Sequence, residues 1–212
     1  MNFDLYVDTS RKGISAAIAN SDGTYLEIVD PAAKGETLSA SLDSLLQQAN
    51  ATLDDVKRVM VTVGPGSFSG LRTGVAFCQG VCFSGKRELF GVTTLQALEC
   101  FGVQGEKTAV VIRARNGYWY LRLDGNESFI ETAEVVEKMK ASNAAASIKS
   151  IVADETAQSD ETLKALFEET GASVTLDTGK PLSCWAPLFN SVKPSLIQEA
   201  NYIQPSYFEK LK

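Results

Sequence analysis

The chain of 212 residues contains no histidine. Histidine acts as a general acid or base, activates serine and cysteine nucleophiles, and is the commonest protein ligand of transition metals. Its absence excludes Ser-His-Asp and Cys-His catalysis, and every histidine metal site, within this chain. Carboxylates or lysines would have to carry any chemistry that the chain performs.

Cysteines are few, and their spacing is not that of a metal site. The four are Cys78, Cys82, Cys100 and Cys184, and no two of them form a Cys-x-x-Cys pair. Cys78 and Cys82 are one helical turn apart in an apolar stretch. We therefore expect buried thiols rather than disulfides or a metal centre, and we assign no metal ligand to this chain.

Long hydrophobic runs and excess positive charge are also lacking. No uninterrupted run of about 18 apolar residues occurs, and the first eight residues have neither the basic nor the long apolar region of a signal peptide. We expect a cytoplasmic protein with no membrane contact. The net charge of −6 argues against direct binding of nucleic acid, which rests on Lys and Arg neutralising phosphates.

The most distinctive stretch is rich in glycine and runs from Gly64 to Gly74. It reads Gly64-Pro65-Gly66-Ser67-Phe68-Ser69-Gly70-Leu71-Arg72-Thr73-Gly74. Its spacing matches neither the Walker A loop, which needs a lysine, nor the Gly-x-Gly-x-x-Gly dinucleotide fingerprint. We interpret it as a tight turn in which Gly66 and Gly70 supply backbone freedom and Ser67 or Ser69 caps a helix; the alternative is an anion site.

Hydrophobic periodicity predicts two similar halves. In the first half we expect strands at 3–8, 14–19, 25–29, 59–63 and 89–92, with helices at 38–49, 71–83 and 95–101. In the second half we expect strands at 110–115, 118–123, 128–131, 150–153 and 173–176, with helices at 132–140 and 159–169. Both halves are βββαβαβ, the pattern of the α/β actin-like, sugar-kinase and Hsp70-type ATPase (ASKHA) fold with two subdomains. We expect one subdomain at 1–103 plus about 186–212 and a smaller one at 104–185.

The strongest hairpin signal is Asn116-Gly117, between the first two strands of the second half. Pairing about this turn predicts Ile112 opposite Leu121 and Ala114 opposite Trp119. The hairpin also carries Arg113, Arg115, Tyr118, Tyr120 and Arg122. This set is either a solvated sheet face with cation–π contacts, which we favour, or a surface that stacks nucleobases.

Asp8 and Thr9 follow the first strand. In the actin-like fold a carboxylate at this point faces the nucleotide, so Asp8 and Thr9 are candidate cofactor-binding residues. The alternative is a chain turn, where Asp and Thr are common. The second half has Asp154-Glu155-Thr156-Ala157-Gln158 where the first has its glycine stretch, so half of the expected phosphate cradle is missing.

Five motifs together resemble the TsaB (YeaZ) family, which takes part in making threonylcarbamoyladenosine in tRNA. They are Leu5-Tyr-Val-Asp-Thr-Ser10, Gly64 to Gly74, Gly91-Val-Thr-Thr-Leu-Gln-Ala-Leu98, Ala114-Arg-Asn-Gly117 with Tyr120, and Pro205-Ser-Tyr207. The resemblance is strong over residues 3–122 and weak beyond. Members commonly have His-Ser at about Lys34-Gly35, Asp at Arg113 and Glu at Tyr118, where this chain departs from the pattern.

The resemblance implies a scaffold without transferase activity of its own. The family pairs through two helices of the first half with itself or with its paralogue TsaD, and the ATPase TsaE joins that complex. TsaD holds a metal through His-x-x-x-His, so ATP or ADP and the metal are expected in the partners or at their interface, with no cofactor in this chain and only indirect contact with tRNA. We expect these interface residues: Leu38, Leu42, Leu45, Leu46, Leu71, Arg72, Val75 and Gln79. An older family label, glycoprotease, does not fit a chain without histidine.

The residues leave a second hypothesis open. The duplicated fold also suits a self-sufficient ATPase or small-molecule kinase that uses Asp8 as its metal carboxylate. Turnover of Mg-ATP that depends on Asp8 would distinguish this enzyme from the scaffold.

Overall fold

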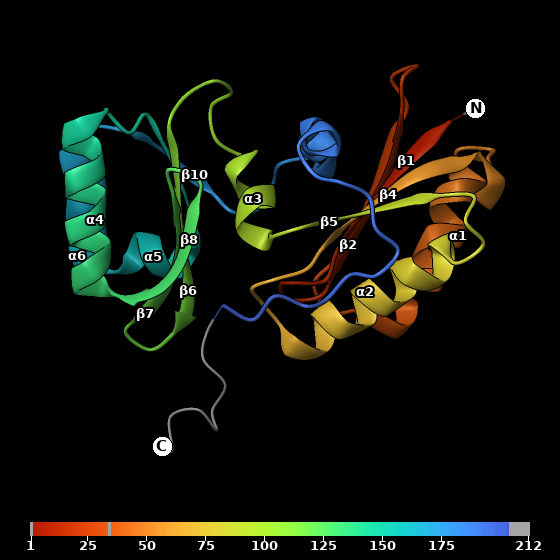
Figure 1. The fold of residues 1–212 in the computed structure, drawn as a ribbon, viewed down its shortest axis with the longest axis horizontal. Helices are drawn as coiled ribbons and strands as arrows, with labels where there is room; N and C mark the ends of the chain where they lie inside the picture. Colours follow the sequence, from red (N-terminus) through yellow and green to blue (C-terminus); the bar gives the residue numbers. More distant parts are fainter. Residues whose placement is uncertain (1, 34, 204–212) are drawn as a thin grey trace. The chain divides into compact units, whose positions relative to one another are not determined.

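The computed structural model describes residues 2–33 and 35–203, and its contacts divide them into two units. Unit 1 comprises the residues up to Thr94 together with Pro181–Asn201, and unit 2 comprises Leu95–Lys180 and the described residues 202–203 (Figure 1). The Pro-Ser-Tyr motif at 205–207 lies outside the described residues. Each unit contains one five-stranded sheet.

The unit boundaries differ from 103/104 and 185/186, the boundaries that the sequence suggested. Arg122 of the second sheet forms an ion pair with Glu99, and a Cβ on Gly102 would overlap Thr108, so this segment packs on unit 2. At the second boundary, the Leu182 amide donates to the Tyr25 hydroxyl at 2.9 Å. The chain therefore returns to unit 1 as soon as it passes Pro181.

Unit 1 begins with a three-stranded meander and continues with two parallel strands. Its strands are β1 (Phe3–Asp8), β2 (Ile14–Asn20), β3 (Tyr25–Asp30), β4 (Val56–Thr62) and β5 (Glu88–Val92), in the spatial order β3-β2-β1-β4-β5. β1, β2 and β3 pair antiparallel, whereas β4 runs parallel to both β1 and β5. Its helices are α1 (Leu38–Gln48) and α2 (Phe68–Cys82), with short 3-10 turns η1 (Gly35–Thr37) and η2 (Leu53–Asp55).

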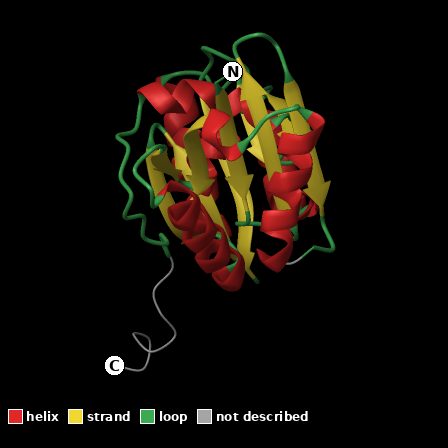
Figure 2. Ribbon diagram, turned by 90° about the vertical axis from the view of Figure 1, so that its right-hand side faces the viewer, coloured by secondary structure: helices red, strands yellow, loops and turns green. Residues whose placement is uncertain are grey.

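Both faces of the first sheet are buried. Phe3, Leu5 and Val7 of β1 belong to one core cluster with the apolar residues of α1 and α2, which lie along this face (Figures 1 and 2). Tyr6 points the opposite way, because successive strand residues alternate. Its ring lies 5.7 Å from that of Phe189 in the 3-10 segment η3 (Leu182–Asn190). The C-terminal return thus covers the second face.

Unit 2 repeats this topology. It contains α3 (Thr94–Glu99), β6 (Thr108–Arg115), β7 (Tyr118–Leu123), β8 (Asn126–Glu131), α4 (Thr132–Ala145), β9 (Ser150–Ala153), α5 (Glu155–Ser159), α6 (Glu161–Thr170) and β10 (Ser173–Leu176). The strands lie in the spatial order β10-β9-β6-β7-β8. β6, β7 and β8 form an antiparallel meander, and β9 runs parallel to both β6 and β10, as in unit 1. The predicted βββαβαβ duplication is confirmed.

The predicted register of the hairpin in unit 2 was wrong. Leu121 pairs with Val111 rather than Ile112, and Trp119 pairs with Arg113, because an irregularity between Arg113 and Arg115 adds a residue to β6. The helix expected at 159–169 is present as α6, and a short additional helix, α5, precedes it, since Asp154 caps α5 and Asp160 caps α6. Each carboxylate accepts hydrogen bonds from backbone amides in the first turn of its own helix, so α5 and α6 are separate helices.

None of the helices in the described chain is both long and apolar enough to cross a membrane.

Candidate functional site

The glycine stretch joins β4 to α2 at the edge of the β1–β2 turn. The Ser67 amide donates to the Ser10 carbonyl at 2.7 Å. Ser67 is the N-cap of α2, and its hydroxyl accepts from the Gly70 amide at 3.3 Å. The loop is therefore tied at one end to the β1–β2 turn and at the other to its own helix.

The glycines of this stretch lie against the chain's own backbone. A Cβ on Gly66 would overlap the Ser10 carbonyl. A Cβ on Gly70 would overlap the Thr9 carbonyl, and one on Gly74 would overlap the Thr9 hydroxyl. Gly64, at a φ of 113°, faces the carbonyl of Asn201 from the C-terminal return. No L side chain fits these positions without displacement. The space that a phosphate cradle would need is filled by backbone at Gly64, Gly66 and Gly70 and by the Thr9 side chain at Gly74.

Asp8 is engaged within the same turn. Its Oδ1 accepts from the Ser10 amide at 2.9 Å, the Ser10 hydroxyl at 2.6 Å and the Thr62 hydroxyl at 2.7 Å. These contacts join the ends of β1 and β4, the arrangement expected of a turn-forming aspartate. No group of three or more Cys, Asp or Glu side chains suited to a metal ion occurs in residues 2–33 and 35–203.

A hollow of about 450 Å³ lies beside the turn and the start of α2. Its lining residues come from the β1–β2 hairpin, the segment before α1 and the first turns of α2. They are Thr9, Arg11, Gly13, Ile14, Ala33, Gly35, Ser67, Ser69, Gly70 and Thr73. None of these residues is acidic, and hydroxyl groups predominate among their polar side chains.

Of the eight predicted interface residues, six lie on the inner faces of α1 and α2, whereas Arg72 is exposed and Gln79 is half-buried. These six are at most 6% exposed: Leu38, Leu42, Leu45, Leu46, Leu71 and Val75. Their side chains pack in the core of unit 1 rather than on an exposed surface. Periodicity identified the apolar face of each helix but not what covers it, and the chain's own sheet covers both.

The outward face of α2 carries Arg72 from the predicted set together with residues that were not predicted. Phe68 begins α2 and is 60% exposed, and Phe83 directly follows the helix and is 80% exposed. Arg72, Ala76 and Gly80 are exposed between them. The Arg72 guanidinium lies 5.4 Å from the centroid of the Phe68 ring. Sequence reasoning missed the two phenylalanines and the small residues, although their spacing of roughly one helical turn was readable. We call Phe68, Arg72, Ala76, Gly80 and Phe83 the outer α2 face.

Gln79, the remaining predicted interface residue, is half-buried and faces the C-terminal return. Its side-chain amide donates to the Gln198 carbonyl at 3.4 Å. The return is also held by the Asn201 amide, which donates to the Val63 carbonyl at 2.6 Å, and by the Ser195 amide, which donates to Leu89. Figure 1 shows this segment running beside α2.

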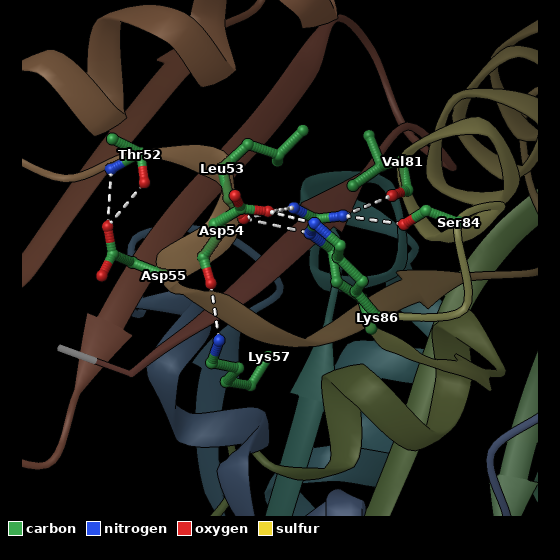
Figure 3. A network of polar contacts seen from close by, with 9 residues as sticks. Thr52, Leu53, Asp54, Asp55, Lys57, Val81, Ser84 and Lys86 are labelled. Carbon is green, nitrogen blue, oxygen red and sulfur yellow. Dashed lines mark hydrogen bonds and ion pairs between the residues drawn. The ribbon is translucent and has the colours of Figure 1, made fainter.

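A buried arginine fixes the far end of α2. Arg87 is 8% exposed, and its guanidinium donates twice to the Leu53 carbonyl, at 3.0 and 2.6 Å, and to the Val81 carbonyl at 3.3 Å. It also bonds Ser84 and pairs with Asp54. Figure 3 shows Leu53, Asp54, Val81 and Ser84, which supply these contacts. Arg87 therefore connects η2 with the last turn of α2 and sets the direction of the helix.

The second hairpin combines cations with aromatic rings. The Arg115 guanidinium lies 4.5 Å from the Tyr118 ring and 5.1 Å from the Phe129 ring, and these rings stack at 4.9 Å. The Tyr118 hydroxyl donates to Glu131, whose hydrogen bond raises the pKa of Tyr118. Cation–π contacts explain why Arg115 lies among aromatic rings on this hairpin, which is the interpretation that we favoured from the sequence.

The remaining members of that hairpin set do not share one exposed face. Tyr120 is buried, and Arg122 pairs with Glu99 and Glu127. The Arg113 amide donates to Asp154 at 2.7 Å, while its side chain is exposed. A continuous surface of five residues for stacking bases is therefore absent from this described hairpin.

The cysteines are free thiols. Cys78 and Cys82 are buried, as expected, whereas Cys100 and Cys184 are half-buried. Burial raises the pKa of Cys82 and that of Cys100 to about 11. Because the thiolate is the reactive form, neither of these two groups is suited to nucleophilic chemistry near neutral pH.

Known proteins similar to this chain agree with this fold. The TsaB protein of Buchnera aphidicola, a tRNA threonylcarbamoyladenosine biosynthesis protein, is 28% identical over 152 residues, which cover 64% of this chain and 72% of that protein. The TsaB of Escherichia coli is 29% identical over 97 residues, which cover 44% of this chain but only 41% of that protein. A solved Pseudomonas aeruginosa structure, described as an uncharacterized protein with similarity to peptidase YEAZ, superposes with a TM-score of 0.69 at 23% identity. It covers 96% of this chain and 100% of that one.

The family comparison covers most of the chain. Residues 32–174 match the model of the TsaD family, described as tRNA N6-adenosine threonylcarbamoyltransferase. The duplicated sheets and the Pseudomonas structure establish the α/β actin-like ATPase fold with two subdomains. Together with the curated relatives, these findings show that the chain belongs to the TsaD family, in which it resembles the TsaB (YeaZ) proteins.

Proposed function

We propose that this chain is an accessory subunit, without catalytic activity of its own, in the formation of N6-threonylcarbamoyladenosine next to the anticodon of tRNA. The observation that carries the proposal is the match of residues 32–174 to the TsaD family in a chain that contains no histidine. A chain without histidine cannot supply the His-x-x-x-His metal site that TsaD uses.

The geometry of the glycine stretch supports the same role. Its four glycines lie against Thr9, Ser10 and Asn201, so they serve packing rather than nucleotide binding. The Asp8 carboxylate is held by Ser10 and Thr62, whose hydrogen bonds give it a structural role in the turn. The actin-like fold is retained here without a phosphate cradle at the glycine stretch.

The partner in this proposal is TsaD, with TsaE joining through it and a homodimer forming when TsaD is absent. ATP or ADP and the metal then belong to the partners or to their interface, and this chain contacts tRNA only indirectly. The outer α2 face suits such pairing, because it is an exposed surface with aromatic ends and small residues at its centre. Ala76 and Gly80 allow a partner helix to approach closely.

Ala76→Glu tests this interface. A charge at the centre of the face would be desolvated on pairing, so we expect the dissociation constant for TsaD to rise at least about tenfold. Val29→Glu is a matched control, since Val29 is exposed on β3 of the same unit. Complex mass and threonylcarbamoylation by the reconstituted proteins are the readouts. A normal complex with Ala76→Glu would place the interface elsewhere.

The isolated chain tests the catalytic assignment. We expect no turnover of Mg-ATP, with or without candidate acceptors. Turnover that Asp8→Ala abolishes in a folded protein would instead identify a stand-alone ATPase or small-molecule kinase.

A further inference from the structure

One edge of the sheet in unit 2 is open, whereas the equivalent edge in unit 1 is covered. β10 lies at the end of the order β10-β9-β6-β7-β8, in the place that β5 has in unit 1. The C-terminal return bonds to β5, since its Ser195 amide donates to the Leu89 carbonyl at 2.8 Å. Within residues 2–33 and 35–203, β10 pairs only with β9. An open strand edge of this kind is a template for another strand.

The hydrogen bonds of β10 show which of its backbone groups face outward. The Ser173 and Asp177 amides donate to carbonyls of the β9 segment, at 3.0 and 3.2 Å. Because backbone groups alternate in direction along a strand, the amides and carbonyls of Val174 and Leu176 point away from β9. These two residues therefore offer donors and acceptors in register to an incoming strand.

The side chains of the same two residues form an apolar strip at the edge. Val174 lies beside Ile151 and Leu176 beside Ala153, and both of those neighbours belong to the core on which α6 packs. Paired residues point to one face of a sheet, so the strip is on the α6 side. Val174 and Leu176 are nevertheless 42% and 39% exposed, and a hollow of about 350 Å³ lies beside them, lined by residues of α6 and β10. The sheet thus extends beyond the cover of its helices.

The charges around this edge suit a second copy of the chain. β10 carries no charged residue, no proline and no irregularity of register, which are features that usually prevent edge strands from pairing. Lys164 and Glu168 line the hollow one turn apart on α6. When two copies of β10 pair antiparallel, the two copies of α6 also run antiparallel, so Lys164 of each copy lies toward Glu168 of the other. Opposite charges then meet on both sides of the symmetry axis.

We propose that two copies of this chain pair through β10, antiparallel about a two-fold axis, and join their two five-stranded sheets into one. Val174 of one copy then lies opposite Leu176 of the other, and the two such pairs exchange about four backbone hydrogen bonds. The axis is perpendicular to the sheet, so the apolar side chains of both copies meet on the same face and cover one another. The interface is self-complementary, as a two-fold dimer requires. It lies in unit 2, whereas the outer α2 face belongs to unit 1.

Sedimentation equilibrium of the full chain carrying Ala76→Glu tests this pairing, because that change weakens dimers formed through the outer α2 face. We expect the Ala76→Glu chain still to dimerise as its concentration rises. Adding Val174→Pro should raise the dissociation constant at least about tenfold, since proline lacks the outward amide but leaves the bonds to β9 in place. Val174→Lys is a second variant, which puts a charge on the edge without changing the backbone. Val29→Lys, at an exposed valine of the edge strand β3, is the matched control and should leave the dissociation constant unchanged.

Hydrogen exchange locates the interface, and the Val174 and Leu176 amides should exchange more slowly as the dimer forms. The proposal is overturned if the Ala76→Glu chain stays monomeric up to about 1 mM. It is also overturned if folded Val174→Pro and Val174→Lys dimerise as well as the Ala76→Glu parent, or if Val29→Lys weakens pairing as much as Val174→Lys. In the chain that keeps Ala76, the β10 variants should bind TsaD normally, so this proposal and the pairing through α2 fail independently.

Discussion

The β4–α2 junction of unit 1 and the β9–α5 junction of unit 2 occupy equivalent places in the duplicated fold. In unit 1 the junction contacts the β1–β2 turn through backbone, with Ser67 bonded to Ser10 and Gly70 lying on Thr9. In unit 2 a side chain makes the connection, because Asp154 accepts both from the Arg113 amide of β6 and from the Ala157 amide of α5.

The difference shows two ways to join a strand end to the start of a helix. Backbone contact needs glycine, tolerates no added atom and brings a long helix close to the sheet. A capping carboxylate makes the connection through a side chain, and here it begins a short helix of five residues, α5. The close junction belongs to the helix that carries the outer α2 face.

The largest expected effect comes from filling the close junction. Gly70→Ala places a methyl group on the Thr9 carbonyl, so we expect a loss of about 3 kcal/mol in the free energy of unfolding, measured with urea. Gly80→Ala is the matched control on the same helix. Nothing lies within 4 Å of its Cβ position, so it should gain up to about 1 kcal/mol from helix propensity. Equal effects of the two substitutions would show that the junction is not tightly packed.

A smaller effect is expected at the equivalent point of unit 2. Asp154→Ala removes the cap of α5 and the contact with Arg113, and we expect it to lower the stability of unit 2 by about 1–2 kcal/mol. Hydrogen exchange of the α5 and β6 amides should localise the loss. Glu155→Ala, one residue along, is the control and should change stability by only a few tenths of a kcal/mol. No loss with Asp154→Ala would mean that its contacts are dispensable.

The smallest expected effect is the dependence of stability on pH at Asp55, which directly precedes β4. The backbone amide and hydroxyl of Thr52 donate to Asp55, which lowers the pKa of Asp55 from 3.8 to about 2. Since the folded pKa is depressed, this capping box stabilises the fold above about pH 4 and is lost as the pH falls towards 2. Carboxyl NMR should show the pKa of Asp55 moving back towards 3.8 in Thr52→Val. An unchanged pKa in that variant would remove the Thr52 hydroxyl as a cause and leave the backbone amide.

Much of the architecture was predictable, because strands and helices leave local periodic patterns. The alternation of Phe3, Leu5 and Val7 located β1, and the spacing of Leu38, Leu42 and Leu45 located α1. The repeat of βββαβαβ then predicted two five-stranded sheets. The register of β6 with β7 was not predictable, because a single extra residue shifts the pairing without changing the composition of either strand.

The candidate site was predicted less well than the fold. The family motif around Gly64 was found, and its failure to match either nucleotide signature was readable from spacing alone. What the glycines touch was not readable, because Thr9 and Asn201 are distant in sequence from the residues that they cover. The hollow beside the glycine stretch likewise had no sequence signal.

The sequence by itself determined the histidine-free chemistry, the order of the elements and the family, since these depend on residue types and on their local spacing. Only the tertiary structure decided which side of α2 is free. The sequence predicted Leu71 and Val75 as a docking surface, but the core of unit 1 buries both. Phe68, Ala76 and Phe83 are the exposed residues. Periodicity records that a face is apolar, but whether the chain's own core or a partner covers it depends on contacts between distant segments.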